Sequence, residues 1–408
     1  MRSITPWLLA VPSLFFIAWG GNHFTPLLPL YDEVADLIPW QTNMLLGTYV
    51  FGLVPGLLVA AALSDVYGRK PITLVGLISS ALGNLLILLG PTSISMLYIG
   101  RFFAGLAVGV GMSVGTSWIK ELSTREWDPK ATIGAGARRP SLTMTLGFGG
   151  GAAVTGALAQ WAPAPTVTPF IVVVTLLVLT LVPTAFAPET VGTTAPQQPS
   201  DQSWVRQLRT PSATHPDFLI KVATAAPWVF GAGGVAYGLL PQIMADATGD
   251  YMTIYAALMA VVTMGVGAFI QPFAQKIDQR LDGRGLPIGL AMVVLGLVVA
   301  SIASYYENPI LGLLAAVILG LGYGSVLVTG LSRVQQIAPP QDLAGLTGIF
   351  YALTYFGFLF PTFIAALLPI MPYNVTLLVF AGLALISMVI AFGRIRHVRG
   401  PWGKRGSS

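Results

Sequence analysis

The stretch AALSDVYGRK at residues 61–70 places Asp65, Arg69 and Lys70 between two long apolar runs. Only 9% of the 408 residues are charged, so three charges within six positions are unusual for this chain. Two apolar runs joined by so short a polar segment predict antiparallel helices with a tight turn. Gly68 can adopt the positive φ that such a turn often requires.

The composition of the whole chain indicates an integral membrane protein. Hydrophobic residues make up 54% of the chain and the mean hydropathy is +0.75, whereas a soluble domain carries roughly a quarter charged residues. There are no cysteines and only three histidines, far apart in sequence, so neither disulfides nor a metal site is expected. We expect no cofactor and no nucleic-acid partner, and interpret the net charge of +5 as a topology signal.

Twelve apolar stretches are long enough to cross a bilayer, which takes about 20 residues. They lie near 7–31, 42–63, 71–91, 94–120, 139–161, 168–187, 217–244, 251–275, 286–306, 308–335, 342–370 and 373–393. A hydrophilic segment at 188–216 divides them into six and six. The predicted organisation is therefore an N-terminal bundle (1–187), a cytoplasmic linker (188–216), a C-terminal bundle (217–394) and a basic tail (395–408).

The distribution of charge predicts that both termini are cytoplasmic. With this orientation, 20 of the 21 lysines and arginines fall on the cytoplasmic side or at its edge, as the positive-inside rule requires. The proposed external loops carry acidic residues and no base. The exception is Arg101, which is expected about 10 Å inside the membrane. Such a residue usually faces a bundle interior or a wet cavity, and the alternative is that it snorkels to the surface.

The longer stretch ALSDVYGRKPITLVG (62–76) resembles the loop signature of the major facilitator superfamily, G-x-L-x-D-x-x-G-R-(K/R). Leu63, Asp65, Gly68, Arg69 and Lys70 match it, while Ala61 stands in place of the leading glycine. Together with twelve spans and a central linker, the resemblance covers the whole chain. It implies an all-α membrane fold of 12 transmembrane helices in two pseudo-twofold-related six-helix bundles.

In that family the loop acts as a conformational latch, which here implies a role for Asp65, Gly68, Arg69 and Lys70. The eleventh predicted span begins near PPQDLAGLTG with its N-terminus at the same membrane face. A helix N-terminus carries partial positive charge, so Asp65 could approach it when that face is closed. Asp342 could instead cap the same helix itself, and both possibilities remain open.

Three further stretches resemble motifs of drug:proton antiporters. They are GGNHFTPLLPLY (20–31) with Pro26 and Pro29, YIGRFFAGLAVGVG (98–111) with Arg101 and Gly105, and LGFGGGAAVTG (146–156) with Gly147, Gly151 and Gly156. The last match is degraded, because Ala152 replaces a proline and Thr155 a glycine. The alternative role of these prolines and glycines is to kink and pack helices.

Few titratable groups lie inside the predicted spans. No Asp or Glu falls in the middle of any span, whereas His23 is expected about 12 Å from the external edge, close to the depth of Arg101. His23, with Asn22 beside it, could face Arg101 and either transfer a proton or help to bind an anionic group. A neutral histidine that only ties helices together is an equal alternative.

Four aromatic residues of the second half are candidates to line a cavity: Trp228, Tyr237, Tyr351 and Tyr355. Tyr351 and Tyr355 are four residues apart and share a helix face, although such spacing is more often helix packing. If they line the cavity, an apolar or aromatic substrate fits better than a sugar, which needs many hydrogen-bonding groups.

The sequence thus predicts a monomeric secondary transporter of the cell membrane that works by alternating access. We expect proton-coupled efflux of a hydrophobic small molecule or drug, energised by the proton gradient. The alternatives are proton-coupled uptake of a sugar or other metabolite, and a non-transporting receptor or scaffold with the same fold. No P-loop or H-E-x-x-H sequence is present, and an enzyme is not expected.

Overall fold

The computed structural model describes residues 5–191, 210–281, 283–339 and 342–392. These residues form helices joined by short turns, with no β-strand among them. Most of the predicted linker and the whole predicted tail at 395–408 lie outside the described residues, and the bundle boundaries at 187 and 217 stay a prediction.

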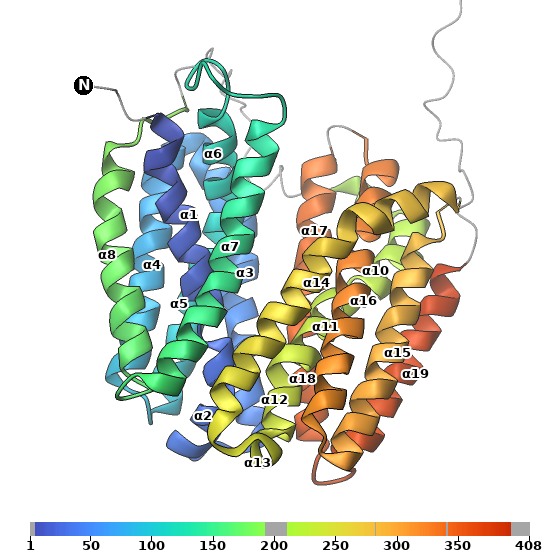
Figure 1. The fold of residues 1–408 in the computed structure, drawn as a ribbon. Coiled ribbons are helices and arrows are strands. Elements are labelled where there is room, and N and C mark those ends of the chain that lie inside the picture. Colours follow the sequence, from blue (N-terminus) through green and yellow to red (C-terminus); the bar gives the residue numbers. More distant parts are fainter. Residues whose placement is uncertain (1–4, 192–209, 282, 340–341, 393–408) are drawn as a thin grey trace, which may run out of the picture.

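The first half of the chain, up to residue 191, forms one group of helices in Figure 1. Its α-helices are α1 (Pro6–Asn22), α2 (Leu28–Val34), α3 (Pro39–Tyr67), α4 (Arg69–Leu89), α5 (Ile94–Val110), α6 (Thr116–Leu122), α7 (Ala135–Trp161) and α8 (Thr168–Phe186). A π-helical turn at Gly111–Gly115 joins α5 to α6, so that Ile94–Leu122 is one continuous span.

The second half, from residue 210, forms the other group. Its α-helices are α10 (Ala223–Ala225), α11 (Trp228–Gly233), α12 (Leu240–Ile243), α13 (Ala245–Thr248), α14 (Met252–Arg280), α15 (Gly285–Tyr306), α16 (Pro309–Ile337), α17 (Leu343–Phe356), α18 (Phe360–Ala366) and α19 (Tyr373–Ala391). Helical segments from Phe218 to Ile243 form one span, and α17 and α18 belong to another.

The membrane fold is confirmed, with a difference at the first span. Eleven helices of the described residues are long and apolar enough to cross a membrane, where the sequence predicts twelve. The stretch predicted at 7–31 is divided into α1 and α2 by a 3₁₀ turn at Thr25–Leu27. Pro26 and Pro29 lie at this division, and each lacks the N–H that would continue the α-helical hydrogen bonds.

The two ends of the molecule differ in charge. At the end shown at the top of Figure 1, α3 ends and α4 begins at the charged turn of residues 65–70, and this end also carries the start of α1. We call it the basic end. The opposite end carries the acidic turns after α2 and around Asp250, and we call it the acidic end.

Helices within each half pack closely through glycine. Gly105 of α5 lies directly against the backbone of α3, where an added Cβ would overlap the Tyr49 carbonyl oxygen. The second half repeats this arrangement: a Cβ on Gly320 of α16 would lie 2.8 Å from the Thr263 carbonyl oxygen of α14. Small residues allow membrane helices to approach this closely.

The two halves are joined by hydrogen bonds at the acidic end. Asn43 of α3 and Gln242 of α12 bond reciprocally through their amides, at 3.0 and 3.2 Å. Gln160 of α7 donates to the Asp250 carbonyl oxygen at 2.8 Å and accepts from Thr253 at 2.9 Å. Among the described residues, no hydrogen bond or ion pair joins the halves at the basic end, where the two groups of helices lie farther apart in Figure 1.

Candidate functional site

A cavity of about 80 Å³ lies between the two halves. Both halves contribute side chains to it. Its lining residues are Gly21, Asn22, Thr25, Leu46, Tyr49, Arg101 and Phe148 from the first half, and Phe230, Tyr237, Met264, Tyr323, Tyr355 and Phe358 from the second. A single water needs roughly 10–15 Å³ of such space, so the cavity holds a small solute or several waters.

Arg101 is the charged residue of this lining. It is 1% exposed, and α5 holds it beside the point where α1 ends. Its Nη1 donates to the Gly21 carbonyl oxygen at 3.2 Å and its Nε to that of Leu45 at 3.4 Å. The guanidinium carbon lies 4.8 Å from the ring centre of Phe24 and 4.7 Å from that of Tyr49. In the described part of the chain, no Asp or Glu forms an ion pair with it.

Asn22 lines the cavity, but His23 does not. Asn22 donates to the Phe148 carbonyl oxygen at 3.0 Å and contacts the sulfur of Met264 at 3.3 Å. His23 is fully buried, and its Nε2 lies 2.5 Å from Oδ1 of Asn84 on α4. The structure therefore places His23 inside the first half, where it links α1 to α4, and its hydrogen bond is to Asn84 and not to Arg101.

The second half contributes a wall of stacked rings. Phe230 stacks on Tyr355, with ring centres 4.3 Å apart, and on Phe358, at 4.9 Å. Tyr237 completes this side of the cavity. Of the four predicted aromatic residues, Tyr237 and Tyr355 thus face the cavity.

The other two predicted aromatic residues pack within the second half. The indole nitrogen of Trp228 donates to the Ser387 hydroxyl at 2.9 Å, and its ring packs on Phe360. Tyr351 is half-buried outside the lining and packs against Phe350, with ring centres 5.8 Å apart.

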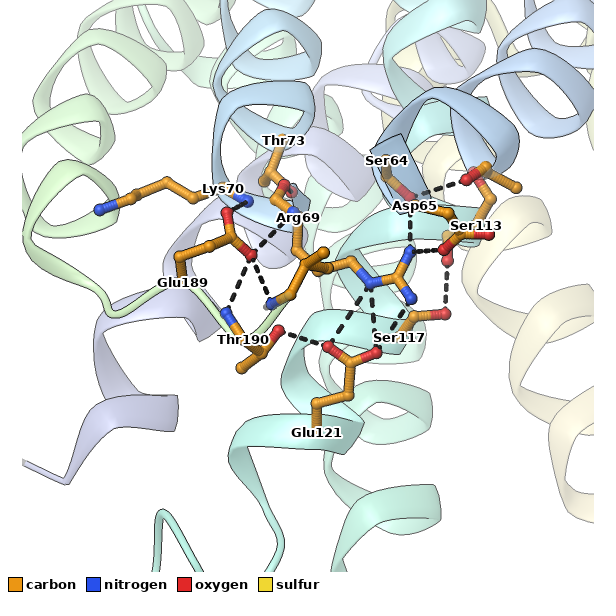
Figure 2. Close-up of polar contacts among 12 residues, drawn as sticks. Ser64, Asp65, Arg69, Lys70, Thr73, Ser113, Ser117, Glu121, Glu189 and Thr190 are labelled. Atoms are coloured by element: carbon orange, nitrogen blue, oxygen red, sulfur yellow. Dashed lines mark hydrogen bonds and ion pairs between the residues drawn. The ribbon is translucent and has the colours of Figure 1, made fainter. Parts of the chain in front are cut away.

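A second polar site surrounds Arg69 at the basic end (Figure 2). Its Nη1 donates to Oδ1 of Asp65 and to the hydroxyl of Ser64, both at 2.6 Å. Its Nε donates to Oε1 of Glu121 at 3.1 Å, and Thr190 also donates to that carboxylate. Arg69 therefore connects the end of α3, the end of α6 and the chain that follows α8.

Glu189 explains why a glycine stands at position 68. Its carboxylate accepts from the backbone N–H groups of Arg69 and Lys70, both at 2.9 Å, at the N-terminus of α4 (Figure 2). A negative charge there is favourable to the helix dipole. Gly68 has φ 101° and ψ 159°, a conformation almost restricted to glycine, and a Cβ would lie 2.5 Å from Oε2 of Glu189.

Asp342 does not cap the helix that it precedes. Its Oδ2 accepts from the backbone N–H of Ser212 at 3.0 Å and from the Ser212 hydroxyl at 2.6 Å. It makes no side-chain capping bond to α17. Asp65 bonds to Arg69, and among the described residues no hydrogen bond or ion pair joins it to α17 in this conformation.

The predicted glycines all lie at helix contacts. Gly147 and Gly151 of α7 pack against α1 at Phe15 and Trp19. A Cβ on Gly156 would overlap that of Ala257 on α14, so Gly156 lies where the two halves meet.

Several site residues have no counterpart among the sequence-based predictions. They are Tyr49, Phe148, Phe230, Met264, Tyr323 and Phe358 in the cavity, Glu121 and Glu189 at the basic end, and Asn43 and Gln242 at the acidic end. Asn43 and Gln242 are amide side chains within apolar runs, and this is the sequence feature that indicates them. Phe230 and Phe358 lie two and three residues from the predicted Trp228 and Tyr355.

Comparison with known families gives one match over most of the chain. The model described as Major Facilitator Superfamily matches residues 10–360. Curated relatives include an uncharacterized transporter of Rickettsia bellii (strain RML369-C), 30% identical over 24% of this chain. Another is an uncharacterized transporter of Schizosaccharomyces pombe (strain 972 / ATCC 24843), 38% identical over 28% of this chain. The matched segment spans 24% of the length of each relative.

Solved structures are similar in fold at low sequence identity. The nucleoside transporter NupG aligns with a TM-score of 0.74 at 14% identity, covering 96% of this chain and 100% of that one. A POT family transporter in complex with 5-aminolevulinic acid aligns with a TM-score of 0.73 at 13% identity, covering 94% of each chain.

Proposed function

Since the chain belongs to the major facilitator superfamily, we propose that it is a secondary transporter that exports a small hydrophobic molecule in exchange for protons. The observation that carries this proposal is the cavity between the halves, which is lined mostly by aromatic and apolar side chains from both of them. Relative movement of the two halves would open such a site to each side of the membrane in turn. With few hydrogen-bonding groups, the lining suits an apolar solute better than a sugar.

The hydrogen bonds between the halves support the proposal that this conformation is closed to the outside of the membrane. Asn43 and Gln242 join them at the acidic end. Basic residues gather at the opposite end, so we propose from the positive-inside rule that the acidic end is external. In this orientation both termini and the linker are cytoplasmic, and the conformation is closed to the outside. The protein is proposed to act as a monomer in the cell membrane.

Asp65 is proposed to act as a latch at the basic end. Its side chain is 49% exposed, and because Asp342 bonds to Ser212, the N-terminus of α17 is not capped by that carboxylate. Closure of the basic end would bring Asp65 toward this positive helix end.

Asp65→Asn is expected to shift the population toward the state that is open at the basic end. Arg69 keeps its bonds to Glu121 and Ser64 in this variant, so loss of the latch should dominate. Distances between spin labels on the two halves at that end measure the shift, with Glu126→Gln, an exposed change in a loop at the same end, as the control. Unchanged distances, or a shift toward closure, would contradict the latch.

His23 is proposed as the proton site. It directly follows Gly21 and Asn22 of the cavity lining, and its Nδ1 is buried with no hydrogen-bond partner among the described residues. Imidazole is the side chain that exchanges protons near neutral pH.

His23→Ala is expected to reduce proton-driven flux at least tenfold while solute exchange without a gradient persists. A pH-sensitive dye inside proteoliposomes reports the proton flux, and labelled solute reports exchange. His215→Ala, at a histidine outside the spans, is the matched control. If the variant retains pH-driven flux, His23 only ties α1 to α4 through Asn84.

The same proteoliposomes test the function itself. A proton gradient is imposed, and apolar solutes, sugars and amino acids are tested in turn. We expect a dye response with a small apolar solute, which should move from the side of the basic end to the side of the acidic end. A response to a sugar moving the other way would favour proton-coupled uptake. If the folded protein gives no flux of any solute, the result would favour a non-transporting receptor or scaffold.

A further inference from the structure

We propose that the cavity binds a small aromatic carboxylate, with Arg101 as the partner of the carboxylate and the rings of the second half as the partner of the aromatic ring. This inference rests on the proposed transport function, for which it specifies the class of substrate. It comes from the charge balance and the shape of the cavity.

The charge of Arg101 is poorly compensated within the protein. Arginine stays protonated at any physiological pH, and a buried charge is costly unless it is paired. Two backbone carbonyl oxygens at 3.2 and 3.4 Å and two ring faces are its partners. No carboxylate of the described residues pairs with it, although those same residues form five basic–acidic pairs elsewhere. A ligand that carries one negative charge would supply the missing counter-charge.

The guanidinium favours a planar acid group. Arginine presents several N–H donors in one plane, and these match the two oxygens of a carboxylate. Two of its nitrogens donate to backbone oxygens on the α1 and α3 side, while the residue also lines the cavity. Tyr49 and Asn22 lie in the same lining and add polar groups at this side.

The opposite side of the cavity favours a flat apolar body. Phe230 stacks with Tyr355 and Phe358, and aromatic pairs prefer offset-stacked or edge-to-face contacts with ring centres about 4.5–7 Å apart. A single aromatic ring can extend this stack. The cavity of about 80 Å³ suits one ring better than a fused polycyclic molecule.

Binding of three probe ligands to the purified, detergent-solubilised protein tests the inference by titration calorimetry. Benzoate combines the ring and the charge, benzamide keeps the shape without the charge, and acetate keeps the charge without the ring. We expect benzoate to bind at least tenfold more tightly than either of the others. Equal binding of benzoate and benzamide, or no measurable binding of benzoate, would overturn the inference without any variant.

Variants locate the carboxylate. Arg101→Gln is expected to weaken benzoate binding at least tenfold and to leave benzamide binding within twofold, while Arg101→Lys retains part of the benzoate affinity. A general disruption of the fold would weaken both ligands together. Arg125→Gln, which changes an exposed arginine near the basic end, is the matched control. Benzoate affinity unchanged in Arg101→Gln would overturn the assignment.

Flux measurements separate this inference from the proposed function. If benzamide or another neutral solute is transported but benzoate does not bind, the proposed anion site is wrong and the proposed transport function stands. Benzoate binding that depends on Arg101, without flux of any solute, would retain the site and overturn the transporter.

Discussion

Gly105→Leu is expected to abolish the folded protein, because α5 cannot approach α3 with a side chain at this position. Even a Cβ would overlap the Tyr49 carbonyl oxygen, and backbone cannot rotate away as a side chain can. Overpacking of a close-packed interior typically costs about 1–3 kcal/mol, and a leucine forced against neighbouring backbone should exceed that range. Detergent extraction followed by size-exclusion chromatography of a fluorescent fusion measures the loss.

Gly382→Leu is the control for this experiment. Gly382 lies in α19, and beyond the neighbouring backbone of that helix no atom of the described structure lies within 4 Å of an added Cβ. The same change of residue in a helix should therefore leave the elution peak unchanged, and Gly105→Ala should give an intermediate loss. A monodisperse Gly105→Leu protein with unchanged thermal stability would contradict the close contact of α3 with α5.

A reversible cross-link between positions 43 and 242 is expected to stop transport completely. The amides of Asn43 and Gln242 lie 3.0 Å apart across the two halves, so a short bis-thiosulfonate reagent should join cysteines placed at both positions. The halves could then no longer separate at the acidic end, and solute flux in proteoliposomes should fall to that of empty vesicles. The chain contains no cysteine, so the two introduced thiols are the only targets.

A cross-link within one half is the matched control. The Tyr98 hydroxyl donates to the Gln41 carbonyl oxygen at 3.0 Å, and both residues lie in the first half at the acidic end. Joining cysteines at 41 and 98 should leave the flux intact, and dithiothreitol should restore the flux of the protein linked at 43 and 242. Full flux through that linked protein would show that transport needs no separation of the halves at this end.

The membrane fold follows from the sequence because its determinants are local. Long apolar runs and the turn at residues 65–70 indicate the spans and the family without any knowledge of packing. The division of the first span was harder to predict. Pro26 and Pro29 indicate a kink, but whether an apolar run that contains prolines stays one helix depends on what packs around it.

The site is only partly predictable, because the rotation of each helix is set by packing across the bundle. Polar or aromatic side chains within apolar spans indicate Arg101, Asn22, Tyr237 and Tyr355. The sequence allows His23 either to face Arg101 or to tie helices together, and the structure turns its side chain toward Asn84. Glu121 and Glu189 lie 52 and 120 residues from Arg69, a separation that no local pattern reveals.

The close contact of α3 with α5 also has a consequence during synthesis of the protein. The contact of Tyr49 with Gly105 joins helices that are separated in the chain by α4, and α14 contacts α16 in the same way across α15. About 55 residues must therefore be translated after position 49 before its partner exists, which takes roughly 3–11 s at ~5–20 residues per second. During that interval the face of α3 around Tyr49 must be covered by lipid or by the insertion machinery, and the same holds for α14 in the second half.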